Sequence, residues 1–184
     1  MSSVAQATIA APVRDGMAAT DRILREVLFR DDVGEVDQLM QHVTSYSGKR
    51  LRPLLVHLCG GLVGRGEGAE ELATVGAIME SLHMATLLHD DVLDEASVRR
   101  QVPTLNGMHG NQVPVLLGDL VYARAFDLSL RLPTIRAAQE ISRMTQAVCR
   151  GEIEQSLARF DGRPEFFGQS CALLRDGHGI GIGR

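Results

Sequence analysis

The sequence of 184 residues is poor in aromatic side chains and has no tryptophan: aromatic residues make up 4% of it. Its core must therefore be aliphatic, and a hydrophobic fraction of 45% can supply one. No apolar run reaches the roughly 18 residues that a transmembrane helix needs. A net charge of −4 also excludes the strongly basic balance of a general nucleic-acid binder. The length suits one domain.

Cysteine and lysine are scarce as well. Cys59, Cys149 and Cys171 are odd in number and widely spaced, with no CxxC pair. We therefore expect reduced packing residues of a cytoplasmic protein, not a disulfide or zinc framework. Lys49 is the single lysine, and it falls in the segment SGKRLRP.

Apolar residues at helical spacing dominate the chain, and no alternating strand pattern is present, so we predict an all-α fold. The segments with this spacing are 17–30, 34–46, a helix starting near residue 50 with Pro53 in its first turn, 69–94, 112–131 and 134–159. Residues 95–110 should form an ordered loop. We expect residues 1–16 to be a flexible N-terminus and the glycine-rich residues 161–184 to be an irregular tail.

The clearest chemistry lies in the segment His89-Asp90-Asp91-Val92-Leu93-Asp94. On a helix, Asp90 and Asp94 share one face, and Asp91 lies about 100° round the axis. Acidic oxygen donors without thiols suit Mg²⁺, which commonly bridges carboxylates to substrate phosphates. Negative charge at a helix C-terminus opposes the helix dipole, and a bound cation would offset that cost. A solvated acidic helix end is the alternative interpretation.

The neighbouring residues favour the metal site. His83 lies two turns before Asp90 on the same face, and Arg99 and Arg100 follow the cluster. A lone histidine is usually a packing residue, and a pair of arginines usually belongs to a solvated surface. Together they suggest a diphosphate held between Mg²⁺ and arginine.

Two further features belong to this pattern. Lys49 and Arg52 lie three residues apart at a predicted helix start, where backbone amides would add to their charge, so they form a candidate second anion site. Leu82, Ala85 and Thr86 precede the carboxylates. They fit ordinary helix packing, or a wall along which a hydrocarbon tail would pass if a diphosphate lies at the mouth.

Several segments resemble the trans-isoprenyl diphosphate synthases of the polyprenyl synthetase family. They are GKRLRP (48–53), ESLHMATLLHDDVLDEASVRRQVPTLN (80–106), GD with ARAF (118–126) and GEIEQ (151–155). The resemblance covers roughly residues 20–158. It implies an all-α isoprenoid synthase-type bundle, usually a homodimer, that condenses isopentenyl diphosphate with an allylic diphosphate and releases diphosphate.

The same resemblance implies a role for each matching residue. Those expected to bind isopentenyl diphosphate are Lys49, Arg52, His83 and Arg100. Asp90 and Asp94 would ligate Mg²⁺ with Asp91 in support, and Arg99 would hold the allylic diphosphate. Small residues at Ala85 and Thr86 are similar to those of longer-chain synthases, so we expect a product longer than farnesyl diphosphate.

The resemblance also implies a second aspartate-rich motif and a Lys-Thr segment, which this sequence lacks. We therefore interpret residues 17–160 as the N-terminal part of a polyprenyl synthetase domain, followed by a tail that fits a truncated or frameshifted reading frame. This leaves activity as the open question.

Two alternatives to an active synthase remain. One is a non-catalytic partner subunit of a synthase. The other is a metal-dependent phosphohydrolase built around His89 and Asp90, for which His57 and His109 lack convincing spacing.

Overall fold

The computed structural model describes residues 10–29, 34–45, 48–64 and 70–160. Its elements in chain order are η1 (Ala11–Val13), α2 (Arg14–Leu28), α3 (Gly34–Ser45), α4 (Leu51–Leu62), α5 (Glu70–Leu93), β1 (Val98–Arg99), β2 (Val102–Pro103), α6 (Leu105–His109), α7 (Gln112–Ser129) and α8 (Arg136–Phe160). The all-α prediction is confirmed, and every helix expected from the periodicity is present. The predictions for the first nine residues and for the tail after residue 160 lie outside the described residues.

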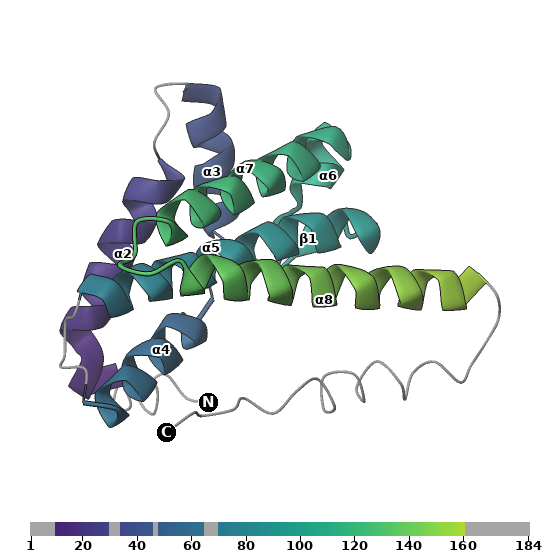
Figure 1. The fold of residues 1–184 in the computed structure, drawn as a ribbon. Helices are drawn as coiled ribbons and strands as arrows, with labels where there is room; N and C mark the ends of the chain where they lie inside the picture. Colours follow the sequence, from purple (N-terminus) through teal and green to yellow (C-terminus); the bar gives the residue numbers. More distant parts are fainter. Residues whose placement is uncertain (1–9, 30–33, 46–47, 65–69, 161–184) are drawn as a thin grey trace. The chain divides into compact units, whose positions relative to one another are not determined.

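The chain divides into two compact units, residues 1–138 and residues 139–184, and α8 falls almost wholly in the second. In the first unit, α5 is the central helix and packs against α7, α2 and α4 (Figure 1). The fully buried side chains of this unit include Leu24, Leu28, Met40, Leu88 and Val121. The core is therefore aliphatic, as the scarcity of aromatic residues requires.

Helical structure begins earlier than the expected residue 17. Pro12 lies in the first turn of η1, where its fixed φ and missing N–H are tolerated, and α2 follows directly at Arg14. Val13 is buried. Burial of Val13 next to Pro12 therefore accounts for helical structure in a segment whose composition did not predict it.

The expected ordered loop at 95–110 contains regular structure of its own. Strands β1 and β2 pair antiparallel, with Val98 opposite Pro103, and α6 follows with Thr104 as its N-cap. Strands of two residues are too short to produce an alternating pattern, which is why the sequence does not reveal them.

Two smaller expectations concern the cysteines and membrane spans. Cys59 and Cys149 are free thiols, as expected, but both are exposed, so their prediction as packing residues is wrong. Cys171 lies outside the described residues. Among the helices described, none has the length and apolar character needed to cross a membrane.

One buried polar contact joins α2, α4 and α5. The His57 ring hydrogen-bonds Thr20 Oγ1 at 2.8 Å, and Thr20 Oγ1 donates to the carbonyl of Ala73. A Cβ at Gly16 would lie 2.5 Å from His57 Nδ1, so only glycine leaves room for the ring. His57 is therefore a packing residue of the core, and its ring hydrogen-bonds Thr20.

Arg124 fixes the other end of α2. Its side chain is 7% exposed, and Nη1 donates to the carbonyl of Leu28 at 2.8 Å. The last carbonyls of a helix lack intrahelical partners, and a buried arginine satisfies them here. This contact ties α7 to α2.

Burial of His57 predicts a pH-dependent stability. Burial lowers the pKa of His57, because it disfavours the charged ring. The folded-state pKa lies below the unfolded value of about 6.5, so this contribution to the free energy of unfolding is complete above about pH 6.5. It is lost as the pH falls toward the folded-state pKa.

Urea unfolding at about pH 7.5 and about pH 5.5 measures this loss. His57→Gln should be less sensitive to the change in pH than the unsubstituted chain. His109 is exposed, so the control His109→Gln should keep the full sensitivity. Equal pH dependence in the two variants would contradict the expectation.

Candidate diphosphate and metal site

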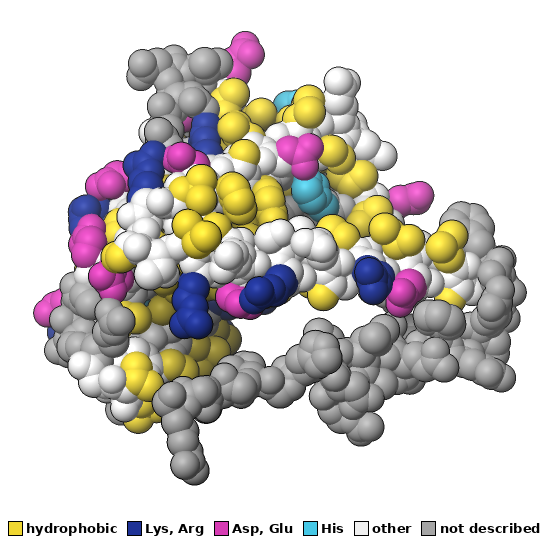
Figure 2. Space-filling model, in the orientation of Figure 1, with side chains coloured by type: hydrophobic (Ala, Val, Ile, Leu, Met, Phe, Trp, Pro, Cys, Tyr) yellow, Lys and Arg dark blue, Asp and Glu magenta, His cyan; other side chains and the backbone are white. Residues whose placement is uncertain are grey.

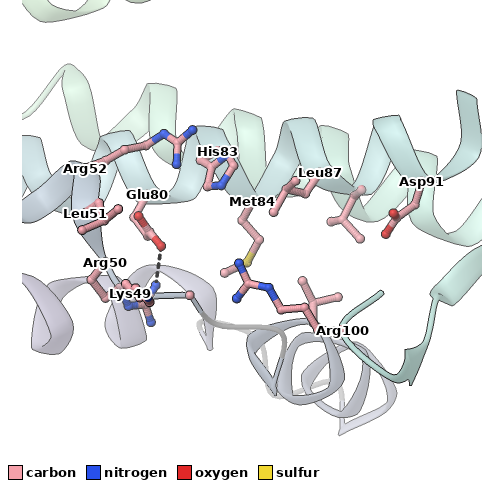
Figure 3. Close-up of a pocket in the computed structure, with 13 residues that line it drawn as sticks. Lys49, Arg50, Leu51, Arg52, Glu80, His83, Met84, Leu87, Asp91 and Arg100 are labelled. Atoms are coloured by element: carbon pink, nitrogen blue, oxygen red, sulfur yellow. Dashed lines mark hydrogen bonds and ion pairs between the residues drawn. The ribbon is translucent and has the colours of Figure 1, made fainter. Parts of the chain in front are cut away.

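A pocket of about 590 Å³ lies between the start of α4, the middle of α5 and the turn of the β1–β2 hairpin. Lys49, Arg52, His83 and Arg100 all line it. These are the four residues that the family resemblance implies for one anion. Figure 3 shows Arg52 beside His83, and Arg100 extending from the hairpin toward α5. The structure thus brings residues from three separate segments around one cavity.

The start of α4 is fixed by Arg50, whose role the sequence did not reveal. Its φ of 50° is left-handed, and its carbonyl accepts the amide of Leu54. Its Nη1 lies 3.0 Å from Glu80 Oε1 (Figure 3). Its Nε lies 3.4 Å from Asp21 Oδ1. Arg50 therefore joins α4 to α5 and α2, between two cations that line the pocket. In the sequence, Glu80 stands within an otherwise apolar helix, and a buried glutamate needs a basic partner. That was the one feature that could have indicated a partner such as Arg50.

His83 is half-buried on α5. Its pKa is lowered chiefly by burial and next by the positive charge of Arg52, with the Glu80 carboxylate opposing the shift. Arg100 and Arg99 lower it further. The ring is therefore neutral at neutral pH and offers one donor and one acceptor. It can hydrogen-bond an anion without adding a charge.

The hairpin presents Arg100 through a strained turn. Arg100 and Gln101, the two residues between the strands, have φ of 49° and 69°. Positive φ at both positions is the pattern of a type I′ hairpin turn, which favours Asn and Gly. A Cβ at Gly48 would lie 3.1 Å from both terminal nitrogens of Arg100, so the guanidinium rests against this glycine.

Backbone strain gathers at this site. In the described part of the chain, the non-glycine residues with positive φ are Arg50, Glu95, Arg100 and Gln101. They lie at the start of α4, just beyond the end of α5 and in the hairpin turn. Strained backbone of this kind persists where surrounding structure enforces it, often at functional sites.

The three aspartates have different surroundings. Asp91 is 2% exposed, and its Oδ1 accepts Arg99 Nε at 2.8 Å and lies 2.7 Å from Arg99 Nη2. This hydrogen bond raises the pKa of Arg99, which the charges of Asp91, Asp90 and Asp94 raise further against the effect of burial. Asp90 is half-buried and Asp94 exposed. Asp91 therefore orients Arg99. Asp90 lies in the last turn of α5, and Asp94 lies just beyond its end, where the Asp94 amide donates to the Asp90 carbonyl at 2.8 Å.

The chemistry of this donor set fits a magnesium ion. Within the described residues, no group of three or more His, Cys, Asp or Glu side chains could hold a metal ion. Mg²⁺ does not need such a cage, since it keeps several waters and uses one or two carboxylates together with substrate phosphates. Asp90 and Asp94 are the residues that would hold it.

The residues expected to form a hydrocarbon wall divide into two groups. Leu82 and Ala85 are 6% and 1% exposed, so both pack in the interior and neither offers an open surface here. Thr86 is exposed, and its Oγ1 donates to the carbonyl of His83 at 2.9 Å. Of the three, Thr86 alone has an exposed side chain, and none of the three lines the pocket.

His89 belongs to the packing between α5 and α7. Its Nε2 lies 3.2 Å from the Val115 carbonyl and 3.3 Å from Asp119 Oδ1. A Cβ at Gly118 would lie 2.4 Å from the same nitrogen, so the ring occupies the space that glycine leaves. The phosphohydrolase hypothesis, which uses His89 beside Asp90, gains no support from this arrangement.

The chain belongs to the polyprenyl synthetase family, whose model matches residues 33–166. It is 37% identical over 139 residues to octaprenyl diphosphate synthase of Escherichia coli, covering 76% of this chain and 42% of that protein. The chain thus spans less than half the length of this curated relative.

Solved structures agree with this membership. A decaprenyl diphosphate synthase from Rhodobacter capsulatus matches with a TM-score of 0.76 and 33% identity, over 83% of this chain and 46% of that one. A polyprenyl synthase from Caulobacter crescentus, complexed with calcium and isoprenyl diphosphate, matches with a TM-score of 0.72 and 30% identity, over 79% and 43%. The helical arrangement is therefore that of the isoprenoid synthases.

The strained turn leads to a stability prediction. Gln101→Gly should stabilise the chain by about 1 kcal/mol, because glycine adopts a left-handed conformation without the Cβ clash. In the exposed helical position Gln41, the same substitution should destabilise by about 1 kcal/mol. Urea unfolding of both variants measures the difference, and a destabilised Gln101→Gly would contradict the strain argument.

Proposed function

We propose that the chain binds isopentenyl diphosphate and an allylic prenyl diphosphate with Mg²⁺, and condenses them in isoprenoid biosynthesis. One observation carries the proposal: Lys49, Arg52, His83 and Arg100 line a single pocket next to the carboxylate end of α5. In a member of this family, such a site suits a diphosphate better than any other ligand class.

Within this proposal the pocket receives isopentenyl diphosphate. Lys49 and Arg52 at the start of α4 and Arg100 in the hairpin turn would supply positive charge, and the neutral ring of His83 would supply a hydrogen bond. Glu80 also lines the pocket and would repel an anion, but Arg50 neutralises it at 3.0 Å. The pocket therefore keeps an excess of positive charge.

The allylic diphosphate would lie at the end of α5. Asp90 and Asp94 would hold Mg²⁺, which when bound neutralises charge that develops on the departing diphosphate. Arg99 would add a fixed positive charge, oriented by Asp91. The prenyl chain would pass Thr86, whose small side chain leaves room for a product longer than farnesyl diphosphate. The names of the octaprenyl and decaprenyl relatives support this length.

We further propose that the chain acts in the cytoplasm, as a homodimer or together with another synthase chain. The absence of disulfide spacing supports the compartment. Exposed apolar side chains on α4, described below, support association.

Incubating the chain with Mg²⁺, labelled isopentenyl diphosphate and an allylic primer tests this function. We expect Mg²⁺-dependent elongation to products longer than farnesyl diphosphate, separated by chromatography. Products ending at farnesyl diphosphate would contradict the length, and no turnover together with no diphosphate binding would contradict the function.

Arg52→Ala is the matched site variant. Loss of one cation from the pocket should weaken isopentenyl diphosphate binding by about tenfold or more. Arg25 is exposed on α2, away from the pocket, and Arg25→Ala should bind as the unsubstituted chain does.

A second candidate function, a non-catalytic partner subunit, is favoured by one surface. Helix α4 exposes the apolar side chains of Leu51, Leu55 and Leu62, which are 43%, 59% and 86% exposed, followed by Val63 at 77%, and Leu51 also lines the pocket. Figure 2 shows hydrophobic side chains at the surface in this region, at the lower left. Contiguous exposed apolar surface commonly marks a protein interface.

Sedimentation of the purified chain tests the partner function. We expect self-association, or binding to a full-length synthase, that Leu55→Asp abolishes without changing the circular dichroism spectrum. The same change at exposed Leu130, which follows directly after α7, serves as the control. A stable monomer that binds no synthase would count against this candidate.

A further inference from the structure

Asn106, on the short helix α6, contacts the backbone that carries the carboxylates. Its Nδ2 donates to the carbonyl oxygen of Asp91 at 3.0 Å. The same oxygen accepts the amide of Ala96 at 2.9 Å. Because Asp91 lies between Asp90, in the last turn of α5, and Asp94, just beyond the end of the helix, these two bonds fix the backbone that carries both carboxylates.

The same contact region holds the arginine hairpin. The Oγ1 of the buried Thr104 donates to the carbonyl of Ala96 at 2.6 Å, and the Thr104 amide donates to the carbonyl of Ser97 at 3.0 Å. Arg99 is bound in turn to the Asp91 side chain. The Asp91 carboxylate therefore binds the hairpin through Arg99, and the Asp91 carbonyl binds α6 through Asn106.

The side chain of Asn106 lowers the stability of the fold in one respect. Its Oδ1 is buried and has no hydrogen-bond partner in the described structure. A buried polar atom without a partner destabilises a fold, whereas an apolar side chain of similar shape avoids that penalty. Stability alone therefore gives a weak reason for an amide here, and the Nδ2 contact gives a better one.

We propose that Asn106 is a positioning residue that holds Asp90 and Asp94 in register with Arg99, so that magnesium and diphosphate meet a preformed site. Asn106 touches neither ligand and acts through the Asp91 carbonyl. The proposal rests on the proposed diphosphate-binding function. Residues that orient metal-binding side chains from behind commonly affect metal affinity by about tenfold or more when substituted.

Calorimetric titration of the full chain with inorganic diphosphate, with and without Mg²⁺, tests this role beside a thermal unfolding scan. Asn106→Leu removes the donor and the unpartnered oxygen together while keeping the volume. We expect Mg²⁺-dependent affinity to fall about tenfold while the unfolding midpoint stays nearly unchanged. Asn106→Gln, which retains an amide donor, should recover part of the affinity.

Asn111 provides the matched control, because it is exposed at the start of α7 and its side chain makes no capping bond there. Asn111→Leu should leave the Mg²⁺-dependent affinity unchanged. If Asn106→Leu fails to fold, Asn106→Ser takes its place, since its side chain is too short for the same bond and should give the same fall.

Each outcome decides between the two ideas. Unchanged Mg²⁺-dependent affinity in a folded Asn106 variant would overturn the positioning role and leave the proposed function standing. If Asn106→Leu and Asn106→Ser each lower the affinity and the unfolding midpoint together, the positioning role is also overturned, and Asn106 is a purely structural residue. If the unsubstituted chain shows no Mg²⁺-dependent binding, the proposed function fails, and the positioning role fails with it.

Discussion

The ion pair between Asp91 and Arg99 is the interaction on which the site's geometry depends. A carboxylate that is 2% exposed is costly to bury unless it is paired, and Arg99 supplies two contacts to one of its oxygens. Because Asp91 belongs to α5 and Arg99 to β1, the pair fixes the hairpin against the end of the central helix. Arg100, the next residue, is thereby directed to the pocket.

The same principle governs the opposite side of the pocket. Glu80 is the second buried carboxylate facing the cavity, and Arg50 pairs with it. Glu80 thus pairs with Arg50 and fixes the start of α4, and Asp91 pairs with Arg99 and fixes the hairpin. The pocket is lined by Lys49, Arg50 and Arg52 on one side and by Arg100 on the other, whereas Arg99 does not line it. Each of the two basic segments therefore contains one arginine that pairs with a buried acid.

Much of this organisation could be predicted from the sequence. Helical spacing gave the helices to within a few residues, because long periodic segments carry a strong signal. The convergence of Lys49, Arg52, His83 and Arg100 was expected from motifs. The type I′ turn was not, because Arg100 and Gln101 lack the Asn or Gly that marks it. Nor could spacing separate Asp91 from its neighbours, since a difference of one residue decides between the interior and the surface of a helix.

Packing also explains why the three residues of the expected wall differ in exposure. Leu82 and Ala85 lie on the side of α5 that its neighbouring helices cover, and Thr86 lies on the side that stays open. Binding and turnover place different demands on that open side. Cations and carboxylates suffice to hold a diphosphate, but an allylic cation must also be shielded from water. With Asp94, Thr86 and Arg100 exposed in the described structure, ligand binding and shielding are separable properties. The proposed diphosphate binding and the proposed turnover would therefore make separate demands on the residues of this first unit.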